Sequence, residues 1–330
     1  MTPQVRSAAL THFASVAAAH GLDARALLAD AGLPARCLEE PDLRIPAPAV
    51  GRLLELAAER AGDSAFGLQM AQARRLSNLG PLGLLLRDEP TLRSALEAVA
   101  QHIHLHNEAI TVRVEQISSL VVIRVELFTQ QGAAVRQATE LTVGVLYRVL
   151  ALFLGTTWSP RLVCFSHGRP ASLAAYRRAF GPAVEFGHEF DGIVCNAAEL
   201  DTPNPGADPV MARYTHQLLA RGAARATSRV RVRQAAVLLL PRGHCRIEVV
   251  AQHLGVDRRT VARRLAAEGT TFSALVAQLR SELLARYLDD GSRPLSEIAA
   301  LLGFSAPGAF ARWHRQRFGT TASSRVGGRR

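Results

Sequence analysis

The stretch that decides the fold is IEVVAQHLGVDRRTVARRLAAEG, residues 247–269. Its landmarks are Ala251, Gly255 and Val261, which are the residue types that a helix, a tight turn and a second helix need. The small alanine lets the two helices cross closely, the glycine accepts the positive φ of the turn, and the branched apolar side chain fills the angle between the helices. The sequence therefore predicts a helix-turn-helix unit at about 247–268.

The same pattern returns in LSEIAALLGFSAPGAFARWHRQRFG, residues 295–319. Ala299, Gly303 and Phe310 take the corresponding places, and the alanine and the glycine each lie 48 positions after their counterparts. One copy is a weak signal in an alanine-rich chain, but two copies in phase are hard to obtain by chance. We therefore predict a second helix-turn-helix unit at about 295–319.

The second helix of each unit has an inner and an outer face, because a helix turns by about 100° per residue. Val261, Leu265 and Glu268 point inward, so Arg259 and Arg263 lie on the opposite side. Arginine suits bidentate contacts with guanine, and glutamine suits adenine. The residues predicted to contact DNA on the two helices are Arg258, Arg259, Thr260, Ala262, Arg263, Arg264, Gly308, Arg312, Arg315 and Gln316.

Start signals and a connecting helix complete the pattern. Asp257 and Ser305 each precede a second helix, where a short oxygen side chain can cap the free amides. Residues 271–291 predict an amphipathic helix between the two units. Such a helix would fix the separation of the two units, so that they enter successive major-groove segments about 34 to 36 Å apart on one face of DNA. The predicted DNA site is long and non-palindromic.

The charge of the chain is concentrated in this region. Residues 1–225 contain 21 Arg and 21 Asp plus Glu, whereas residues 226–330 contain 18 Arg and 7 Asp plus Glu, so the whole net charge of +11 belongs to the second segment. A concentration of this kind is typical of a phosphate-binding domain. The alternative, a solvated arginine face without any partner, does not account for it.

Composition excludes several classes of chemistry. The chain has no lysine, which rules out a Walker A loop, a Schiff-base enzyme and a pyridoxal-phosphate enzyme. The cysteines are widely separated and predict reduced core thiols: Cys37, Cys164, Cys195 and Cys245. There is no GxSxG or HExxH motif and no close Cys-His arrangement. We expect no cofactor, no metal and no enzymatic activity.

The sequence favours a cytoplasmic protein that joins the nucleoid when bound to DNA and has no membrane partner. The N-terminus lacks a long apolar core. The most apolar run, residues 141–155, is interrupted by Arg148 and is too short to span a bilayer.

From about Arg229 to Arg325 the chain resembles the C-terminal domain of the AraC/XylS family of bacterial transcription regulators. The most specific part is IAALLGFSAPGAFARWHRQRFG, residues 298–319, in its Ile-Ala, its Leu-Gly-Phe-Ser and its Phe-x-Arg. The chain departs from the family at His314, where phenylalanine is common, and at Thr321 and Ala322, where the family has Ser-Pro followed by an aromatic residue. The resemblance implies promoter DNA and RNA polymerase as partners.

The first 225 residues mix helical and strand patterns. Helices are predicted at 8–20, 48–61 and 135–154. Antiparallel strands are predicted at 109–115 and 120–128, with further strands in 162–167 and 192–196. The fold class is therefore an α+β N-terminal domain followed by an all-α DNA-binding domain, with a linker at about 222–228.

Pieces of this N-terminal part resemble the ligand-sensing domain of one AraC subgroup, the arabinose-binding type, which includes regulators of ornithine and arginine use. They include NLGPLG, residues 78–83, and LAAYRRAFGPAVEFGHEFDGIVCN, residues 173–196. The similarity extends from about 26 to 219. It implies a small-molecule effector and a homodimer, while the effector and its pocket residues stay unknown.

Two polar groups stand out in this part. His102 and His106 would share a helix face, but no third metal ligand is evident; with His104 they are expected to be surface or interface histidines, and an effector or pH-sensing role is the alternative. Arg136 and Glu140 predict an ion pair at a helix surface, with pairing to a zwitterionic ligand as the alternative.

Together these patterns predict a one-component transcription regulator with an effector-binding and dimerisation domain, residues 1–225, and a DNA-binding domain, residues 226–330. Two alternatives stay open. One is a DNA-binding protein whose N-terminal part only oligomerises. The other is an enzyme that a basic tail tethers to DNA, which the lack of a catalytic constellation disfavours.

Overall fold

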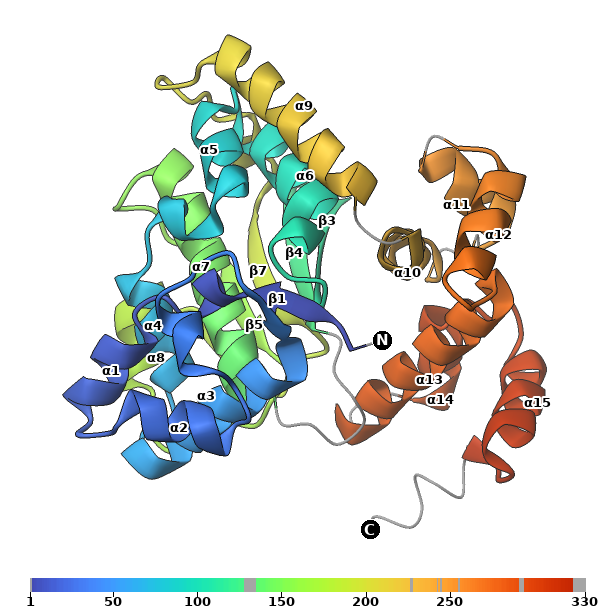
Figure 1. The fold of residues 1–330 in the computed structure, drawn as a ribbon, viewed down its shortest axis with the longest axis horizontal. Helices are drawn as coiled ribbons and strands as arrows, with labels where there is room; N and C mark the ends of the chain where they lie inside the picture. The colour runs from blue at the N-terminus through green and yellow to red at the C-terminus, as the bar shows by residue number, and fades with distance from the viewer. Residues whose placement is uncertain are drawn as a thin grey trace. The chain divides into compact units, whose positions relative to one another are not determined.

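The computed structural model describes residues 2–127, 135–225, 228–241, 243, 245–254, 256–290 and 294–322. The chain divides into two compact units, Met1–Arg225 (unit 1) and Ala226–Arg330 (unit 2) (Figure 1). Unit 1 combines helices with sheets, and the described part of unit 2 contains only helices, so the predicted fold class is confirmed. Gly255 and residues 226–227 of the predicted linker lie outside the described residues.

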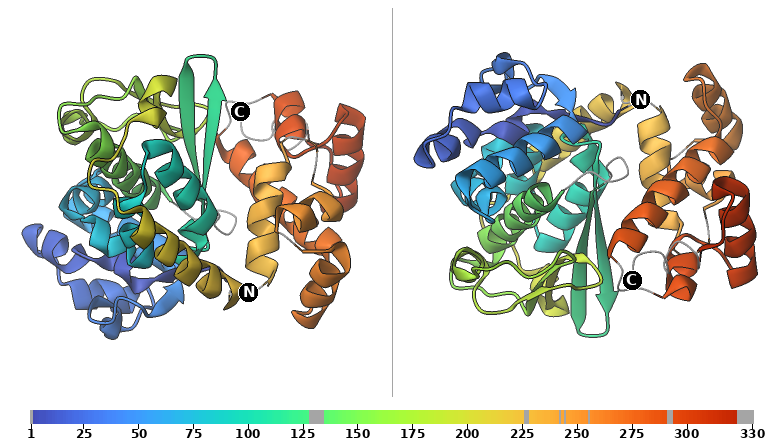
Figure 2. Two further views of the ribbon diagram at one scale, coloured as in Figure 1. Left: turned by 90° about the horizontal axis from the view of Figure 1, so that it is seen from above. Right: turned by 90° about the horizontal axis from the view of Figure 1, so that it is seen from below.

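Unit 1 contains a five-stranded sheet with the order β3-β4-β7-β5-β6, in which only the pair β5 and β6 is parallel. Its strands are β3 (Ile110–Ile117), β4 (Leu120–Leu127), β5 (Leu162–Phe165), β6 (Val184–Phe186) and β7 (Asp191–Asn196). A separate two-stranded sheet pairs β1 (Gln4–Arg6) with β2 (Arg44–Pro46). The hairpin of β3 and β4, seen as two long teal arrows in Figure 2, matches the predicted antiparallel pair. The short strands β1, β2 and β6 were not predicted.

Unit 1 also contains helices. They are α1 (Phe13–Ala19), α2 (Ala24–Asp30), α3 (Ala47–Ala61), α4 (Phe66–Ala73), α5 (Pro81–Asp88), α6 (Leu92–His102), α7 (Arg136–Leu154), α8 (Ala174–Phe180) and α9 (Pro209–Arg225). Short 3-10 turns are η1 (Ser7–Leu10), η2 (Ala35–Leu38), η3 (Leu76–Leu79), η4 (Ile103–Leu105) and η5 (Ala197–Asp201). The single helix predicted at 8–20 is wrong: His12 has a φ of 69°, which interrupts a right-handed helix between η1 and α1.

Helix α7 lies at the centre of unit 1, against α3, α4 and the sheet. Among the described residues it is the helix whose length and composition would allow it to cross a membrane. The apolar run 141–155 covers most of this helix, which starts five residues earlier, at Arg136. Half of the helix is buried inside the protein, as the core residues Val143 and Leu150 show.

Unit 2 consists of α10 (Ser228–Leu239), α11 (Ile247–His253), α12 (Arg258–Ala267), α13 (Phe272–Asp290), α14 (Leu295–Leu301) and α15 (Pro307–Phe318). Helix α10 packs against α11, α12 and α13. The core of this region includes Val232 and Ala235 of α10, Val250 and Ala251 of α11, and Val261, Leu265 and Leu275. The predicted connecting helix corresponds to α13.

The crossing of α4 and α7 has no space for side chains at two glycines. A Cβ atom at Gly144 would lie 2.5 Å from the Cβ of Ala71, and one at Gly67 would lie 2.1 Å from the carbonyl oxygen of Gln137. The Gly67 amide also donates to the side-chain oxygen of Gln137 at 2.8 Å. The backbones of α4 and α7 therefore lie too close together for a Cβ atom at either glycine.

We predict that Gly67→Ala lowers the free energy of unfolding by about 1–3 kcal/mol, because the new methyl group forces the two helices apart. Urea unfolding followed by circular dichroism measures the loss. Gly168→Ala is the matched control, since a Cβ atom at Gly168 meets nothing within 4 Å. Equal stability of the two variants would contradict the close crossing.

Candidate nucleic-acid interface and buried polar cluster

The second helix of the first helix-turn-helix unit, α12, begins at a side-chain cap. The Asp257 carboxylate accepts hydrogen bonds from the Thr260 amide at 2.7 Å and from the Thr260 hydroxyl at 2.9 Å. This satisfies one of the free amides that start every helix. The cap also fixes Thr260, which lies half-buried at the edge of the outer face.

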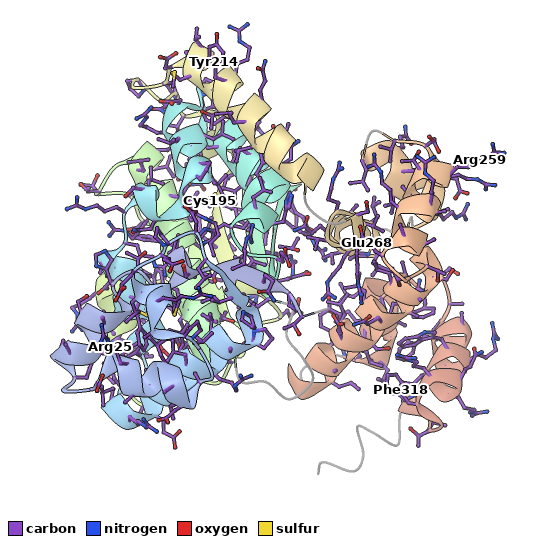
Figure 3. The ribbon with its side chains drawn as sticks, viewed as in Figure 1. Arg25, Cys195, Tyr214, Arg259, Glu268 and Phe318 are labelled. Carbon is purple, nitrogen blue, oxygen red and sulfur yellow. The ribbon has the colours of Figure 1, made fainter. Side chains whose placement is uncertain are left out.

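Helix α12 presents a clear inner and outer face. Val261 and Leu265 are buried, together with Ala251 of the preceding helix. The outer face is exposed and carries Arg258, Arg259, Ala262, Arg263 and Arg264. Figure 3 shows Arg259 projecting away from the helices of unit 2. One of these arginines has a partner: Nη1 of Arg258 lies 3.1 Å from Oε1 of Glu248.

The second unit starts differently. Ser305 is not the N-cap of α15: that position is Ala306, which makes no side-chain cap, and Pro307 follows at the start of the helix. The predicted capping role of Ser305 is wrong because Ser305 lies one residue before the N-cap position, and the alanine at that position has no side-chain oxygen. Pro307 fixes φ at the first helical position and needs no partner for an amide there, so this helix begins without a side-chain cap.

Helix α15 also has two faces. Phe310 and His314 are buried, with Ala299 of α14 beneath them. The exposed residues of α15 include the four predicted to contact DNA, Gly308, Arg312, Arg315 and Gln316. Between the helices, Gly303 has a φ of 74°, and a Cβ atom there would lie 2.4 Å from the carbonyl oxygen of Leu240. Glycine is therefore required at this turn both for its conformation and for contact with the end of α10.

Two polar contacts fix the second unit. The buried His314, which replaces the phenylalanine common in the family, pairs through Nδ1 with the carbonyl oxygen of Thr320 at 2.9 Å. Arg280 of α13 donates from Nε to the carbonyl oxygen of Leu302 at 2.9 Å, and its guanidinium stacks on the Phe304 ring at 4.4 Å. The connecting helix is therefore attached directly to the second turn.

Sequence reasoning missed the role of Glu268. Its carboxylate accepts hydrogen bonds from the Ser228 amide at 2.6 Å and from the Arg229 amide at 2.9 Å. It thereby caps the first turn of α10 from the end of α12. The available signal was a carboxylate on the inner face beside Val261 and Leu265, because such a group needs donors from a neighbouring element.

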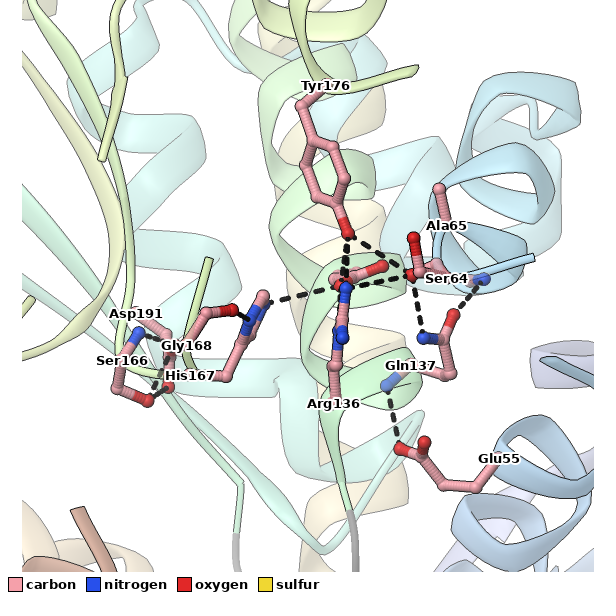
Figure 4. A network of polar contacts seen from close by, with 12 residues as sticks. Glu55, Ser64, Ala65, Arg136, Gln137, Ser166, His167, Gly168, Tyr176 and Asp191 are labelled. Atoms are coloured by element: carbon pink, nitrogen blue, oxygen red, sulfur yellow. Dashed lines mark hydrogen bonds and ion pairs between the residues drawn. The ribbon is translucent and has the colours of Figure 1, made fainter. Parts of the chain in front are cut away.

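In unit 1, Arg136 and Glu140 form an ion pair, but not at a helix surface: the Glu140 side chain is fully buried. One carboxylate oxygen accepts from Nε of Arg136 at 2.8 Å and from the Tyr176 hydroxyl at 2.6 Å. Nε2 of His167 lies 3.3 Å from the same oxygen. Figure 4 shows these contacts around the start of α7. We refer to these four residues as the Glu140 cluster.

The Glu140 cluster is electrostatically unusual. Burial raises the pKa of Glu140 to about 7, although the bonds from Arg136 and Tyr176 oppose the rise. Its second oxygen has no hydrogen-bond partner among the described residues. Glu55, which accepts from the Gln137 amide at 2.8 Å, also has a pKa raised by burial. Incompletely satisfied buried carboxylates are more frequent at functional sites than elsewhere.

The three histidines lie elsewhere in the unit and are all buried, so their expected surface or interface location is wrong. Helix α6 ends at His102 and η4 follows, so His102 and His106 do not share one α-helical face. Burial lowers the pKa of His102 to about 4 and that of His106 to about 3, which makes both neutral at pH 7. All three side chains are at most 6% exposed, so each is a buried polar group.

Metal binding finds no support in the part of the chain that the structure describes, where no group of three or more His, Cys, Asp or Glu is placed to hold an ion. All four cysteines are free thiols. Three of them are buried, which keeps them away from oxidants.

Two helix-turn-helix units with arginines exposed on their second helices, in a unit that holds the whole net charge of +11, define a DNA-binding protein. Comparison with known families agrees. Residues 250–324 match a helix-turn-helix domain, and residues 21–204 match the arabinose-binding N-terminal domain of AraC transcription regulators. The chain therefore belongs to the AraC family of transcription regulators, with an arabinose-binding-like sensing domain ahead of its DNA-binding domain.

Relatives extend over almost the whole chain. The chain is 34% identical to the transcriptional regulator VirS of Mycobacterium tuberculosis, over 82% of this chain and 81% of that protein. It is 26% identical to the ornithine utilization regulator of Pseudomonas aeruginosa, over 93% and 91% respectively. Among solved structures, the transcriptional regulator CdpR of Pseudomonas aeruginosa shares 22% identity at a TM-score of 0.46, covering 92% of this chain and 96% of that one.

The buried histidines predict a pH dependence of stability. A histidine in the unfolded chain takes up a proton near pH 6.5, whereas native His106 does so only near pH 3, so the free energy of unfolding falls as the pH is lowered below about 6.5. Each such histidine contributes a slope of up to about 1.4 kcal/mol per pH unit. Glu140 acts in the opposite direction, because its raised pKa stabilises the native state as the pH falls below 7.

Comparison of wild type with His106→Gln measures the contribution of His106 to the pH dependence of the free energy of unfolding. The variant should lose less stability than wild type between pH 7 and pH 5 in urea titrations. His12→Asn, at an exposed position in the left-handed region that asparagine tolerates, should retain the wild-type slope. Parallel pH profiles for wild type and His106→Gln would show that His106 is not held neutral.

Proposed function

We propose that the outer faces of α12 and α15 each enter the major groove of promoter DNA and read its sequence. The observation that carries this proposal is the exposure of arginines on both helices while the opposite faces are buried. Arg259 and Arg263 of α12, and Arg312 and Arg315 of α15, can reach base edges. Ala262 and Gly308 leave room for the helices to approach the groove closely.

The length of the connecting helix α13 supports contact with successive groove segments, because it is comparable with their separation. A helix of the length of α13, 19 residues, extends over about 28 Å. Successive major-groove segments on one face of DNA lie about 34 to 36 Å apart. Arg280 attaches α13 to the second turn, which supports a fixed rather than an independent arrangement of the two reading helices.

Unit 1 supplies the regulatory part of the proposal. It senses a small-molecule effector and forms a homodimer, and the regulator acts in the cytoplasm on RNA polymerase at the promoter. The relatives are bacterial proteins named as regulators, one of them for ornithine utilization, which favours a sensor over an enzyme. A purely oligomerising unit 1 is the second candidate, and it is supported by an apolar stripe on α9.

That stripe is the proposed dimer surface. Val210, Met211, Tyr214 and Leu218 are 50%, 44%, 60% and 61% exposed, and they follow one side of the helix. Leu84 of α5, a helix that packs against α9, is 52% exposed. Figure 3 shows Tyr214 pointing outward from α9. Contiguous apolar side chains of this kind mark interaction sites, and a two-fold axis would bring the same stripe of two copies together.

For DNA reading, we predict that Arg263→Ala weakens specific binding by about 1–3 kcal/mol and relaxes preference at one part of the site. Arg312→Ala should do the same at bases about one helical turn away. Gel-shift titration and footprinting of the full-length variants, on DNA selected by wild type from a random library, provide the measurement. Arg178→Ala, an exposed arginine of unit 1, is the control. Loss of protection at the same base pairs in both variants would rule out two separate reading helices.

For dimerisation, we predict that Tyr214→Glu produces a monomer, because burying a carboxylate in an apolar interface is costly. Sedimentation velocity measures the mass. Ala220→Glu introduces the same group at an exposed position of α9 outside the stripe and should leave the dimer intact. The monomer should also bind DNA more weakly, since the effective concentration of the second subunit is lost. A Tyr214→Glu protein with the mass of wild type would exclude this surface.

A further inference from the structure

A cavity of about 390 Å³ lies between helix α8 and strand β6 of unit 1, and neither the fold nor DNA binding explains it. This volume is within the range of small-molecule sites, roughly 300–1,000 Å³. The residues that line it fall into a charged set and an apolar set. The charged set is Arg169, Arg177 and Glu185, and the apolar set includes Leu173, Val184 and Phe186.

The charged set is available to a ligand. Arg169, Arg177 and Glu185 are all exposed, and none forms an ion pair with another described residue. Two guanidinium groups against one carboxylate leave an excess of positive charge at the cavity. A guanidinium binds a carboxylate through charge-assisted hydrogen bonds, which are stronger than those between neutral groups.

The apolar side of the cavity is rigid. The Phe186 ring stacks on Phe165 with centroids 5.6 Å apart and meets the Tyr176 ring edge-on at 5.2 Å. Tyr176 also lines the cavity and is fully buried, and its hydroxyl donates to Glu140. These aromatic contacts hold Phe186 and Tyr176 in place before any ligand arrives, so little conformational entropy is lost on binding.

We propose that this cavity is the effector site of unit 1 and that it binds a small carboxylic acid with an aromatic or similarly compact apolar body. The carboxylate pairs with Arg169 and Arg177, and the apolar body packs on Phe186, Val184 and Leu173. The assignment rests on the proposed sensing function and specifies its ligand class. Binding reaches the core through Tyr176, whose hydroxyl bond to Glu140 connects the cavity to helix α7.

Glu185 distinguishes two kinds of ligand that carry a carboxylate and an apolar body, namely a plain organic acid and an amino acid. The ammonium group of an amino acid gains an ion pair with Glu185, whereas a plain acid leaves this carboxylate unpaired. 3-Phenylpropionate and phenylalanine form a matched pair for the comparison, because both carry a carboxylate and a phenyl ring. Phenethylamine has the ring and the ammonium group without the carboxylate.

The test is calorimetric titration of the full-length protein with these three compounds. The proposal predicts binding of at least one of the two acids and no binding of phenethylamine. The double variant Arg169→Ala/Arg177→Ala should weaken acid binding by at least about tenfold, the effect of losing one charge-assisted hydrogen bond. Arg178→Ala removes an exposed arginine next to Arg177 that does not line the cavity, and it should bind normally. If phenylalanine binds more tightly than 3-phenylpropionate, Glu185→Gln should abolish the difference.

The experiments distinguish failure of the proposed binding site from failure of the proposed sensing function. Absence of binding by both acids, or equal losses in Arg178→Ala and the double variant, would overturn the site. Gel shifts with and without the bound acid then examine regulation: binding that leaves DNA affinity unchanged would preserve the site and reject its sensing function. A small molecule that changes DNA affinity equally in wild type and in the double variant would preserve the sensing function and reject this site.

Discussion

The arrangement of the DNA-binding unit depends on helix α10 and the residue after it, which contact both helix-turn-helix units. At its start, the amides of Ser228 and Arg229 bond to Glu268 at the end of α12. Just past its end, the carbonyl oxygen of Leu240 lies so close to Gly303 that no side chain fits there. Two segments therefore connect the two helix-turn-helix units, α10 with the residue after it and the connecting helix α13. A shift of one of these helices would have to break contacts that the other helix maintains.

The sequence predicts the parts of this arrangement that depend on local chemistry. Apolar and charged residues on α12 alternate with the period of a helix, so the buried Val261 and the exposed Arg263 follow from their positions in the chain. The cap by Asp257 is equally local. Contacts between distant segments are not encoded in a short pattern, which is why the bonds of Glu268 and the approach of Leu240 to Gly303 were not foreseen. The failure at Ser305 has a local cause, since Pro307 two residues later already starts the helix.

In the sensing unit, too, features that depend on local sequence were predicted, and features that depend on tertiary packing were not. The hairpin of β3 and β4 has a strong alternation and was predicted, whereas β6 has three residues, too few for a periodic signal. His102 and His106 were expected at the surface or at an interface. Tertiary packing instead buries both rings, and this burial lowers their pKa values and keeps them neutral at pH 7. Glu140 shows the corresponding effect for an acid, since burial raises its pKa and favours the neutral form, while the hydrogen bonds from Arg136 and Tyr176 oppose the rise.

The two amides held by Glu268 have a further consequence. Helix α9 ends at Arg225 and helix α10 begins at Ser228. The first amides of any helix have no carbonyl partner within that helix. Glu268 supplies an acceptor for two of them from a position 40 residues further along the chain. The beginning of α10 is therefore stabilised by a side chain that is present only when α12 has folded against it.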